Sequence, residues 1–208
     1  MKKLSAGDGL FRGYRLVLAS NSPRRRELLE GLGLDFEVRV LDGVDESYPA
    51  CLDVAHVPEY ISRVKADAYL DGLECGELLI TADTIVTIDG IVLGKPSDAE
   101  DAKRMLRLLS GRRHQVITGV TLATAGRSRS FSVVTGVTFS QLTEDEIEYY
   151  VSEFRPLDKA GAYGIQEWIG YIGVERIEGS YFNVVGLPVD RLYRELENFC
   201  RYSGSESR

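Results

Sequence analysis

The chain has 208 residues, of which 44% are hydrophobic and 27% are charged, and its formal net charge is −7. This composition is typical of a globular protein that buries a substantial core. The negative charge argues against a nucleic-acid binder, because such proteins offset the phosphate backbone with excess positive charge. No apolar run is long enough to span a bilayer, so we expect no membrane partner.

Three cysteines, Cys51, Cys75 and Cys200, lie far apart and form no C-x-x-C pair. They are typical of reduced thiols. The first residues lack the apolar run of a signal peptide, so we expect no such peptide and a cytoplasmic protein. We expect a single domain over residues 15–200, with two lobes around a central cleft as an open alternative. Residues 1–14 and 201–208 are expected to be a flexible leader and tail.

Hydrophobic patterning predicts alternating strands and helices along this domain. The predicted strands are 15–20, 36–40, 78–88, 91–93, 115–123 and 129–139. The predicted helices are 23–32, 58–70, 97–109, 143–154 and 188–199. Asp89-Gly90 predicts a hairpin turn, and capping boxes are predicted at 97–100 and 143–146. The fold class is therefore α/β, with a mixed, twisted sheet flanked by helices and a ligand expected beyond the strand ends, at helix N-termini.

Three arginines stand where the first helix should begin. Ser22 is a good N-cap and Pro23 suits the first helical position, but Arg24, Arg25 and Arg26 then add cations to the positive end of the helix dipole. A bound phosphate or carboxylate would resolve this conflict. The alternative is a solvated basic face.

Other charged residues occur near predicted turns. Asp83 lies inside an apolar strand, where a carboxylate must be paired, bind a metal or face outward. Lys95 precedes a capped helix, and Lys65 lies on a mostly apolar helix, although both positions also suit solvated lysines. The acidic segment 42–46 suits a hard cation or a hydrated loop. Together these groups favour Mg²⁺-dependent phosphoryl chemistry.

Several catalytic motifs are absent from the sequence. It contains no G-x-x-x-x-G-K-[ST], no G-x-G-x-x-G after a strand, no H-E-x-x-H and no G-x-S-x-G. His56 and His114 are the only histidines, which leaves little scope for a histidine metal site. The glycine-rich segments 158–166 and 178–188 could approach a ligand closely or form tight turns. Gln166 could pair with a base edge through its amide.

Seven blocks, in order over residues 15–195, resemble the Maf family of nucleoside triphosphate pyrophosphatases. They are L-A-S-N-S-P-R-R, V-D-E, A-D-T, G-K-P, L-S-G-R-R-H-Q-V-I-T-G-V, D-K-A-G-A-Y-G-I-Q and G-S-Y-F-N-V-V-G-L-P. The A-G-A-Y-G-I-Q block resembles the branch that hydrolyses dTTP and UTP. The resemblance implies a Maf/inosine-triphosphatase-like fold and cleavage of a nucleoside triphosphate into a monophosphate and pyrophosphate.

The resemblance also implies roles for individual residues. Asp83 matches the proton acceptor, and Arg24, Thr84 and Gln166 match positions that set base specificity. The positions expected around the triphosphate are Ser20, Ser22, Arg25, Lys65 and Lys95. Glu46, and Asp83 if it is a ligand as well as a base, would hold Mg²⁺ or Mn²⁺. Arg26 has no matching role, and Glu167 and Trp168 stand where many relatives have glycine.

Two alternatives to dTTP and UTP hydrolysis stay open. One is a pyrophosphatase for 7-methyl-GTP or another non-standard nucleotide, and the other is a non-catalytic nucleotide-binding regulator of cell division. We expect a nucleoside triphosphate as the substrate and no nucleic-acid partner, and a homodimer is compatible with the sequence. An RNA-binding module is disfavoured by the net charge and by the lack of aromatic residues between the arginines of 24–26.

Overall fold

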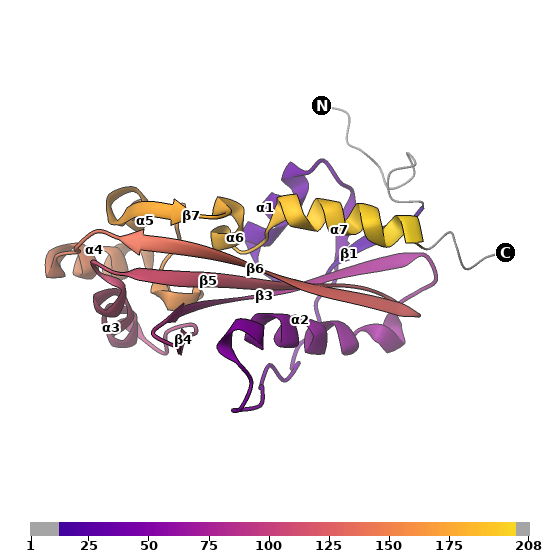
Figure 1. Ribbon diagram of the computed structural model, residues 1–208, viewed down its shortest axis with the longest axis horizontal. Coiled ribbons are helices and arrows are strands. Elements are labelled where there is room, and N and C mark those ends of the chain that lie inside the picture. Colours follow the sequence, from indigo (N-terminus) through magenta and orange to yellow (C-terminus); the bar gives the residue numbers. More distant parts are fainter. Residues whose placement is uncertain (1–12, 203–208) are drawn as a thin grey trace. The chain divides into compact units, whose positions relative to one another are not determined.

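The computed structural model describes residues 13–202 (Figure 1). In chain order, its elements are β1 (Arg15–Leu18), α1 (Pro23–Gly31), β2 (Phe36–Val38), η1 (Val54–His56), α2 (Val57–Asp67), η2 (Leu70–Gly72), β3 (Glu77–Ile88), β4 (Ile91–Leu93), α3 (Ala99–Leu109), β5 (Arg113–Thr124), β6 (Arg127–Phe139), α4 (Glu144–Phe154), η3 (Ala160–Ala162), α5 (Trp168–Gly173), β7 (Val174–Glu178), α6 (Tyr181–Val185) and α7 (Val189–Tyr202). The expectations for residues 1–12 and 203–208 lie outside the described residues.

The strands form a mixed sheet in the order β2-β1-β3-β5-β6-β7, with β4 paired to β3. β1 is parallel to both β2 and β3, whereas β3–β4 and β6–β7 are antiparallel pairs. This arrangement confirms the predicted α/β class with a mixed sheet and flanking helices. Among residues 13–202, no helix combines the length and apolar character needed to cross a membrane.

The chain divides into two compact units. The first comprises the chain up to Asp83, Thr118–Val133 and the chain from Gly186, and the second comprises Thr84–Ile117 and Val134–Val185. β3, β5 and β6 each contribute residues to both units. The expectation of a single domain over 15–200 stays a prediction.

In the first unit, the period-two alternation of the strands separates two cores. Leu16 and Leu18 of β1 join one cluster with residues of α1 and α7, whereas Val17 joins another with Ala66 of α2. Successive side chains of a strand point to opposite faces, so α1 and α7 cover one face and α2 covers the other (Figure 1). The apolar residues 16–18 of this strand are therefore buried on both sides of the sheet, as parallel strands are.

The second unit has one core. Buried side chains of α3, α4 and α5 pack there with residues of β3, β4, β5 and β6. Tyr150 of α4 and Phe139 of β6 are among its largest fully buried side chains. Asp89 and Gly90, with φ of 51° and 76°, form the predicted turn between β3 and β4.

Helix capping follows the sequence in two cases and departs from it in one. Ser22 caps α1, and Thr143 and Glu146 form the predicted capping box of α4. The predicted box at 97–100 is wrong by one residue, because Asp98 is the N-cap of α3 and its Oδ1 accepts from Asp101 N at 2.8 Å. A carboxylate caps as well as a hydroxyl does, so the two adjacent candidates could not be separated by residue type.

The C-terminal third contains elements that the sequence analysis did not predict. β7, α5 and α6 have only five or six residues each, which is too short to show a helical or alternating period. α7 begins at Val189, directly after Pro188, and extends to Tyr202, three residues beyond its predicted end. Short elements of this kind depend on packing rather than on local pattern.

Candidate functional site

Three parallel strands bring polar residues to one edge of the sheet in the first unit. Register pairs join Leu18 to Val38 and Leu18 to Ile80, so β2, β1 and β3 run the same way at this point. Ser20 follows the end of β1, the acidic loop with Glu46 follows the end of β2, and Asp83 lies three residues beyond Ile80 on β3. Carboxyl ends of parallel strands are where α/β folds bind ligands.

Asp83 faces α2 because of its position in the alternation of β3. Leu79 lies four residues before Asp83, on the same face of β3, and packs in the core that α2 covers. Thr81, between them on this face, donates from Oγ1 to the Ser62 carbonyl oxygen of α2 at 2.6 Å. Two residues further along β3, Asp83 Oδ1 accepts from Lys65 Nζ at 2.8 Å. Two alternate residues of the strand thus contact Ser62 and Lys65, which are three residues apart and lie on the same face of the helix.

Lys65 also contacts a second carboxylate. Its Nζ lies 3.1 Å from Glu46 Oε1, and only 16% of its side chain is exposed, against 13% for Asp83 and 52% for Glu46. The carboxylate that the sequence places in an apolar strand is therefore ion-paired, as burial requires. An ammonium group between two carboxylates leaves one excess negative charge, and we call Glu46, Lys65 and Asp83 the acidic-lysine cluster.

The donor set of this cluster fits a shared divalent cation. Within the described part of the chain, no group of three or more His, Cys, Asp and Glu residues could hold a metal ion alone. Mg²⁺ is typically held by one or two carboxylates together with substrate phosphates and water. Glu46 and Asp83 supply two such carboxylates and could hold Mg²⁺ or Mn²⁺ together with a bound phosphate group.

The first turn of α1 engages Arg25 internally. Ser22 Oγ accepts from Arg25 N at 3.4 Å, and Ser20 Oγ accepts from Ser22 N at 3.2 Å and from Arg25 Nη1 at 3.4 Å. Arg25 Nε donates to the Gly186 carbonyl oxygen at 2.9 Å. The conflict with the helix dipole is thus eased by polar partners within the chain.

Electrostatics connect Arg25 to the acidic-lysine cluster. Desolvation lowers the pKa of the Arg25 guanidinium, whereas the charges of Asp83 and Glu46 raise this pKa and Arg24 lowers it. Arg25 and Arg24 are half-buried, and Arg26 is exposed. Arg26 therefore differs from Arg24 and Arg25 in its exposure, and the separate roles of the three arginines stay a prediction.

The remaining predicted residues lie in the second unit. The Gly161 N–H donates to the Gly94 carbonyl oxygen at 3.0 Å, and a Cβ on Gly161 would come 2.9 Å from Val86 Cβ. This close approach, at φ of 66°, requires glycine and brings the loop of Gln166 to the loop of Lys95 and to β3, which carries Thr84. Lys95 itself is exposed.

Gln166 has an unusual side chain. Its Oε1 is buried and has no hydrogen-bond partner among residues 13–202. A buried acceptor without a partner is costly, so a donor supplied by a ligand would stabilise it. The predicted site residues thus form two groups, one in each unit.

The residues that hold α2 against β5 were not predicted from the sequence. A Cβ on Gly119 of β5 would lie 2.3 Å from the Pro58 carbonyl carbon and from Glu59 N, so only glycine allows this approach. Ser62 Oγ lies 2.9 Å from Thr121 Oγ1, in a buried pair that ties α2 to β5. A glycine inside a strand pattern was the signal available for this contact.

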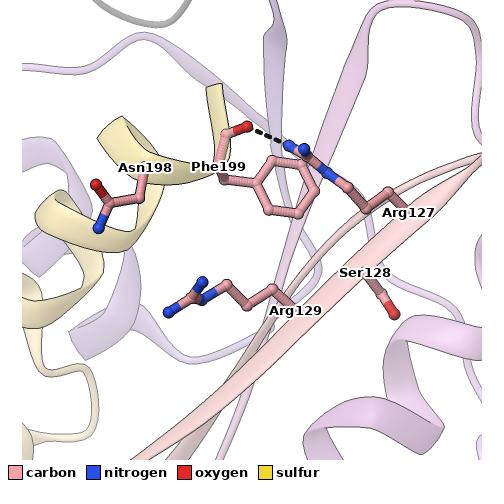
Figure 2. A pocket seen from close by; sticks show the side chains of 5 residues that line it. All are labelled: Arg127, Ser128, Arg129, Asn198 and Phe199. Atoms are coloured by element: carbon pink, nitrogen blue, oxygen red, sulfur yellow. Dashed lines mark hydrogen bonds between the residues drawn. The ribbon is translucent and has the colours of Figure 1, made fainter. Parts of the chain in front are cut away.

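A pocket of about 260 Å³ lies beside α7 in the first unit, and Figure 2 shows its lining residues: Arg127, Ser128, Arg129, Asn198 and Phe199. Arg127 donates to the Phe199 carbonyl oxygen, and its guanidinium lies 3.8 Å from the Phe199 ring centroid. Arg129 pairs with Glu195, which is 2% exposed. None of the predicted site residues lines this pocket, and its arginines bind α7.

Comparison with known proteins identifies the family of this chain. The chain matches the Maf-like protein family over residues 15–199. It is 59% identical over 184 residues to a dTTP/UTP pyrophosphatase of Phocaeicola vulgatus and 60% identical over 184 residues to one of Bacteroides thetaiotaomicron. Each alignment covers 88% of this chain and 95% of the relative.

A solved structure supports the fold. The Staphylococcus aureus Ham1 protein is similar with a TM-score of 0.51 and 16% identity, over 89% of this chain and 99% of that protein. This likeness concerns the fold alone and agrees with the predicted architecture. Because the family match covers residues 15–199 and the relatives reach 60% identity, the chain belongs to the Maf-like protein family.

Proposed function

We propose that this chain hydrolyses dTTP and UTP to the corresponding monophosphate and pyrophosphate. Relatives with 59% and 60% identity carry the name dTTP/UTP pyrophosphatase, and their alignments cover 95% of each relative. The observation that supports the chemistry is the acidic-lysine cluster at the carboxyl ends of β1 and β2. It combines two carboxylates, one of them the proposed base Asp83, with the Lys65 ammonium, which lies 2.8 Å from Asp83 and 3.1 Å from Glu46.

Asp83 is the proposed proton acceptor. Its partly buried carboxylate is held by Lys65 at 2.8 Å, which fixes the position of the carboxylate. When a triphosphate binds, Lys65 can turn one of its three N–H donors to a phosphate oxygen. Asp83 then accepts a proton from the attacking water, a role worth about two to four orders of magnitude in rate.

The first turn of α1 is the proposed phosphate-binding element. Backbone N–H groups at a helix N-terminus favour an anion, and Ser20, Ser22 and Arg25 lie there. Arg25 can exchange its present acceptor, the Gly186 carbonyl oxygen, for a phosphate oxygen. Lys95, an exposed cation of the second unit, is proposed to bind phosphate as well.

Glu46 and Asp83 are proposed to hold Mg²⁺ or Mn²⁺ together with the substrate. Such a cation would neutralise triphosphate charge and help to polarise the phosphoryl group. If Asp83 is a metal ligand, its capacity as a base is reduced. We therefore assign the metal mainly to Glu46, whose side chain is the more exposed of the two.

Arg24, Thr84 and Gln166 are proposed to select the base. The buried Oε1 of Gln166 has no hydrogen-bond partner in the described part of the chain and suits the N3–H donor of uracil or thymine. The names of the relatives favour these bases over 7-methyl-guanine and favour an enzyme over a non-catalytic regulator. We further propose a cytoplasmic protein, in which the exposed Cys51 and Cys75 stay reduced. The proposal includes no nucleic-acid or membrane partner, and a homodimer is compatible with it.

A panel of triphosphates tests this proposal. Pyrophosphate release is measured for UTP, dTTP, CTP, GTP and 7-methyl-GTP, with and without Mg²⁺ or Mn²⁺. We expect the highest kcat/KM for UTP and dTTP and a loss of activity when the divalent ion is chelated. A preference for 7-methyl-GTP, or turnover no faster than in buffer alone, would overturn the proposed function.

A further inference from the structure

The turn that carries Gln166 is tied at both ends. The Glu167 N–H donates to the Gly164 carbonyl oxygen at 2.9 Å, which closes a four-residue turn around Ile165 and Gln166. Ile165, only 6% exposed, packs into the core of the second unit. One central residue of the turn is therefore fixed in the core, and the other carries the amide proposed to read the base.

A single hydroxyl group bridges the two ends of this turn. Tyr150 Oη accepts from the Gly164 N–H at 3.0 Å and donates to Glu167 Oε2. Tyr150 lies on α4 and is fully buried. Burial, followed by the hydrogen bond to Glu167, raises the pKa of the Tyr150 hydroxyl, so it stays a proton donor at neutral pH.

The other carboxylate oxygen of Glu167 has its own partner. Lys159 Nζ lies 3.1 Å from Glu167 Oε1 and 2.7 Å from Asp158 Oδ1, and Lys159 is only 8% exposed. A Cβ on Gly164 would come 2.8 Å from Glu167 Cδ and 3.0 Å from Lys159 Cε, so this ion pair packs directly against the turn. Burying a lysine is costly, and the proposed phosphate chemistry does not use this residue.

We propose that Tyr150, Lys159 and Glu167 form a clasp that positions Gln166 for base selection. This inference rests on the proposed function and deepens it. The three residues hold the backbone of the turn at Gly164 and Glu167. The Gln166 side chain therefore extends toward a pyrimidine from a backbone whose position is fixed. They are positioning residues, because they act through Gln166 and are not proposed to contact the nucleotide.

The position of the Gln166 amide matters because uracil and cytosine have the same shape and differ in the hydrogen-bond donors and acceptors at positions 3 and 4 of the ring. Uracil presents an N3–H donor and a carbonyl acceptor, whereas cytosine presents an N3 acceptor and an amino donor. A glutamine amide can satisfy either edge if it is free to shift and turn. Selection for uracil therefore requires that the amide be held, and a loosened turn accommodates both bases.

Two variants disturb the clasp with little change of volume. Tyr150→Phe removes the bridging hydroxyl and keeps the buried ring, and Glu167→Gln keeps an acceptor for Tyr150 but removes the charge that pairs with Lys159. Tyr171→Phe is the matched control, because Tyr171 lies on the adjacent α5 with 83% of its surface exposed. Trp168 is the only tryptophan and directly follows Glu167, so its fluorescence reports nucleotide binding without turnover.

The test compares kcat and KM for UTP and CTP in the wild type and the variants, alone and combined with Gln166→Ala. We expect the UTP-to-CTP ratio of kcat/KM to fall about tenfold in Tyr150→Phe and less in Glu167→Gln, mainly through KM for UTP. Trp168 titrations with UMP should show the same weakening. In the Gln166→Ala background, Tyr150→Phe should not lower the ratio further, because both changes remove one interaction.

Two results would overturn the clasp. One is an unchanged UTP-to-CTP ratio in both variants, and the other is an equal further loss in the Gln166→Ala background, which would assign Tyr150 to stability alone. Circular dichroism at the assay temperature verifies folding, and Glu167→Gln carries the test if Tyr150→Phe fails to fold. If the wild type releases pyrophosphate but the variants keep its UTP-to-CTP ratio, the clasp is refuted and the proposed function stands. If the wild type releases none, the proposed function fails and the clasp fails with it.

Discussion

Lys65 Nζ of α2 lies 2.8 Å from Asp83 Oδ1 of β3, and this ion pair joins the helix to the strand at the edge where the parallel strands β1 and β2 end. Both side chains are less than a fifth exposed, so the pair is more than a surface contact. Glu46, at 3.1 Å from the same ammonium, makes Lys65 the centre of the cluster. Removal of the Lys65 ammonium should therefore change the charge of the cluster, the position of both carboxylates and the rate of catalysis.

We predict that Lys65→Met lowers kcat/KM for UTP by about a hundredfold or more, because it removes a positioned cation from developing phosphate charge. Initial rates of pyrophosphate release measure this effect. Lys103→Met is the matched control, since Lys103 on α3 is 13% exposed and is also paired with two carboxylates, Glu100 and Glu148. A loss in Lys65→Met no greater than in the control would remove Lys65 from the site.

We predict that Gly119→Ala destabilises the protein by about 3 kcal/mol or more, because overpacking against backbone cannot relax by a side-chain movement. The added Cβ would lie 2.3–2.4 Å from backbone atoms of Pro58 and Glu59. Urea denaturation measures the free energy of unfolding. Gly126→Ala, whose Cβ would meet no atom of residues 13–202 within 4 Å, should change this free energy by less than about 0.5 kcal/mol. Equal effects of the two substitutions would mean that α2 does not lie this close to β5.

We predict that the protein loses stability as the pH falls from about 6.5 to about 4. Burial lowers the pKa of His114 from 6.5 to about 4, so in this range the unfolded chain binds a proton that the folded chain does not. This contribution of His114 is of the order of 3 kcal/mol and is fully lost below about pH 4, where the histidine is protonated in both states. Urea midpoints measured from pH 7 to 4.5 follow this change.

A substitution separates the contribution of His114 from that of other groups. His114 Nε2 lies 2.8 Å from Tyr163 Oη, so His114→Asn should be less stable at pH 7 but should show a flatter pH dependence. His56→Gln, at an exposed histidine, should keep the wild-type slope. Glu77, whose pKa is lowered to about 2, mainly by its hydrogen bond with Arg39, contributes stability that is lost only as the pH falls below about 4.5. An unchanged slope in His114→Asn would refute the assignment.

The sequence predicted the elements that have a clear period or a turn signal. The cap at Ser22 and the Asp89-Gly90 turn follow from local chemistry, and both are present. The strand predicted over 15–20 is present as well, although it ends at Leu18. The sequence also placed Asp83 among apolar residues, where the carboxylate would be paired, bind a metal or face outward. The partner was not predictable, because Lys65 lies 18 positions earlier and reaches Asp83 only through the packing of α2 on β3.

Other parts of the site depend on contacts with no local signature. Gly119 resembles any strand glycine until α2 is packed against it. Tyr150 resembles a core aromatic residue, and its hydroxyl gains a role only because the loop of Gly164 and Glu167 folds over α4. The glycines of segment 158–166 mark it as unusual in the sequence, but the contacts of Glu167 with Tyr150 and Lys159 depend on the three-dimensional structure.

Product analysis of UTP hydrolysis with wild-type protein and Asp83→Asn, in the presence of Mg²⁺, tests the central claim most directly. ³¹P NMR distinguishes UMP and pyrophosphate from UDP and phosphate, and Asp67→Asn, at the exposed end of α2, is the control. We predict UMP and pyrophosphate from the wild type and the control, and a rate lower by about a hundredfold or more in Asp83→Asn. Release of UDP and phosphate, or an unchanged rate in Asp83→Asn, would contradict the account.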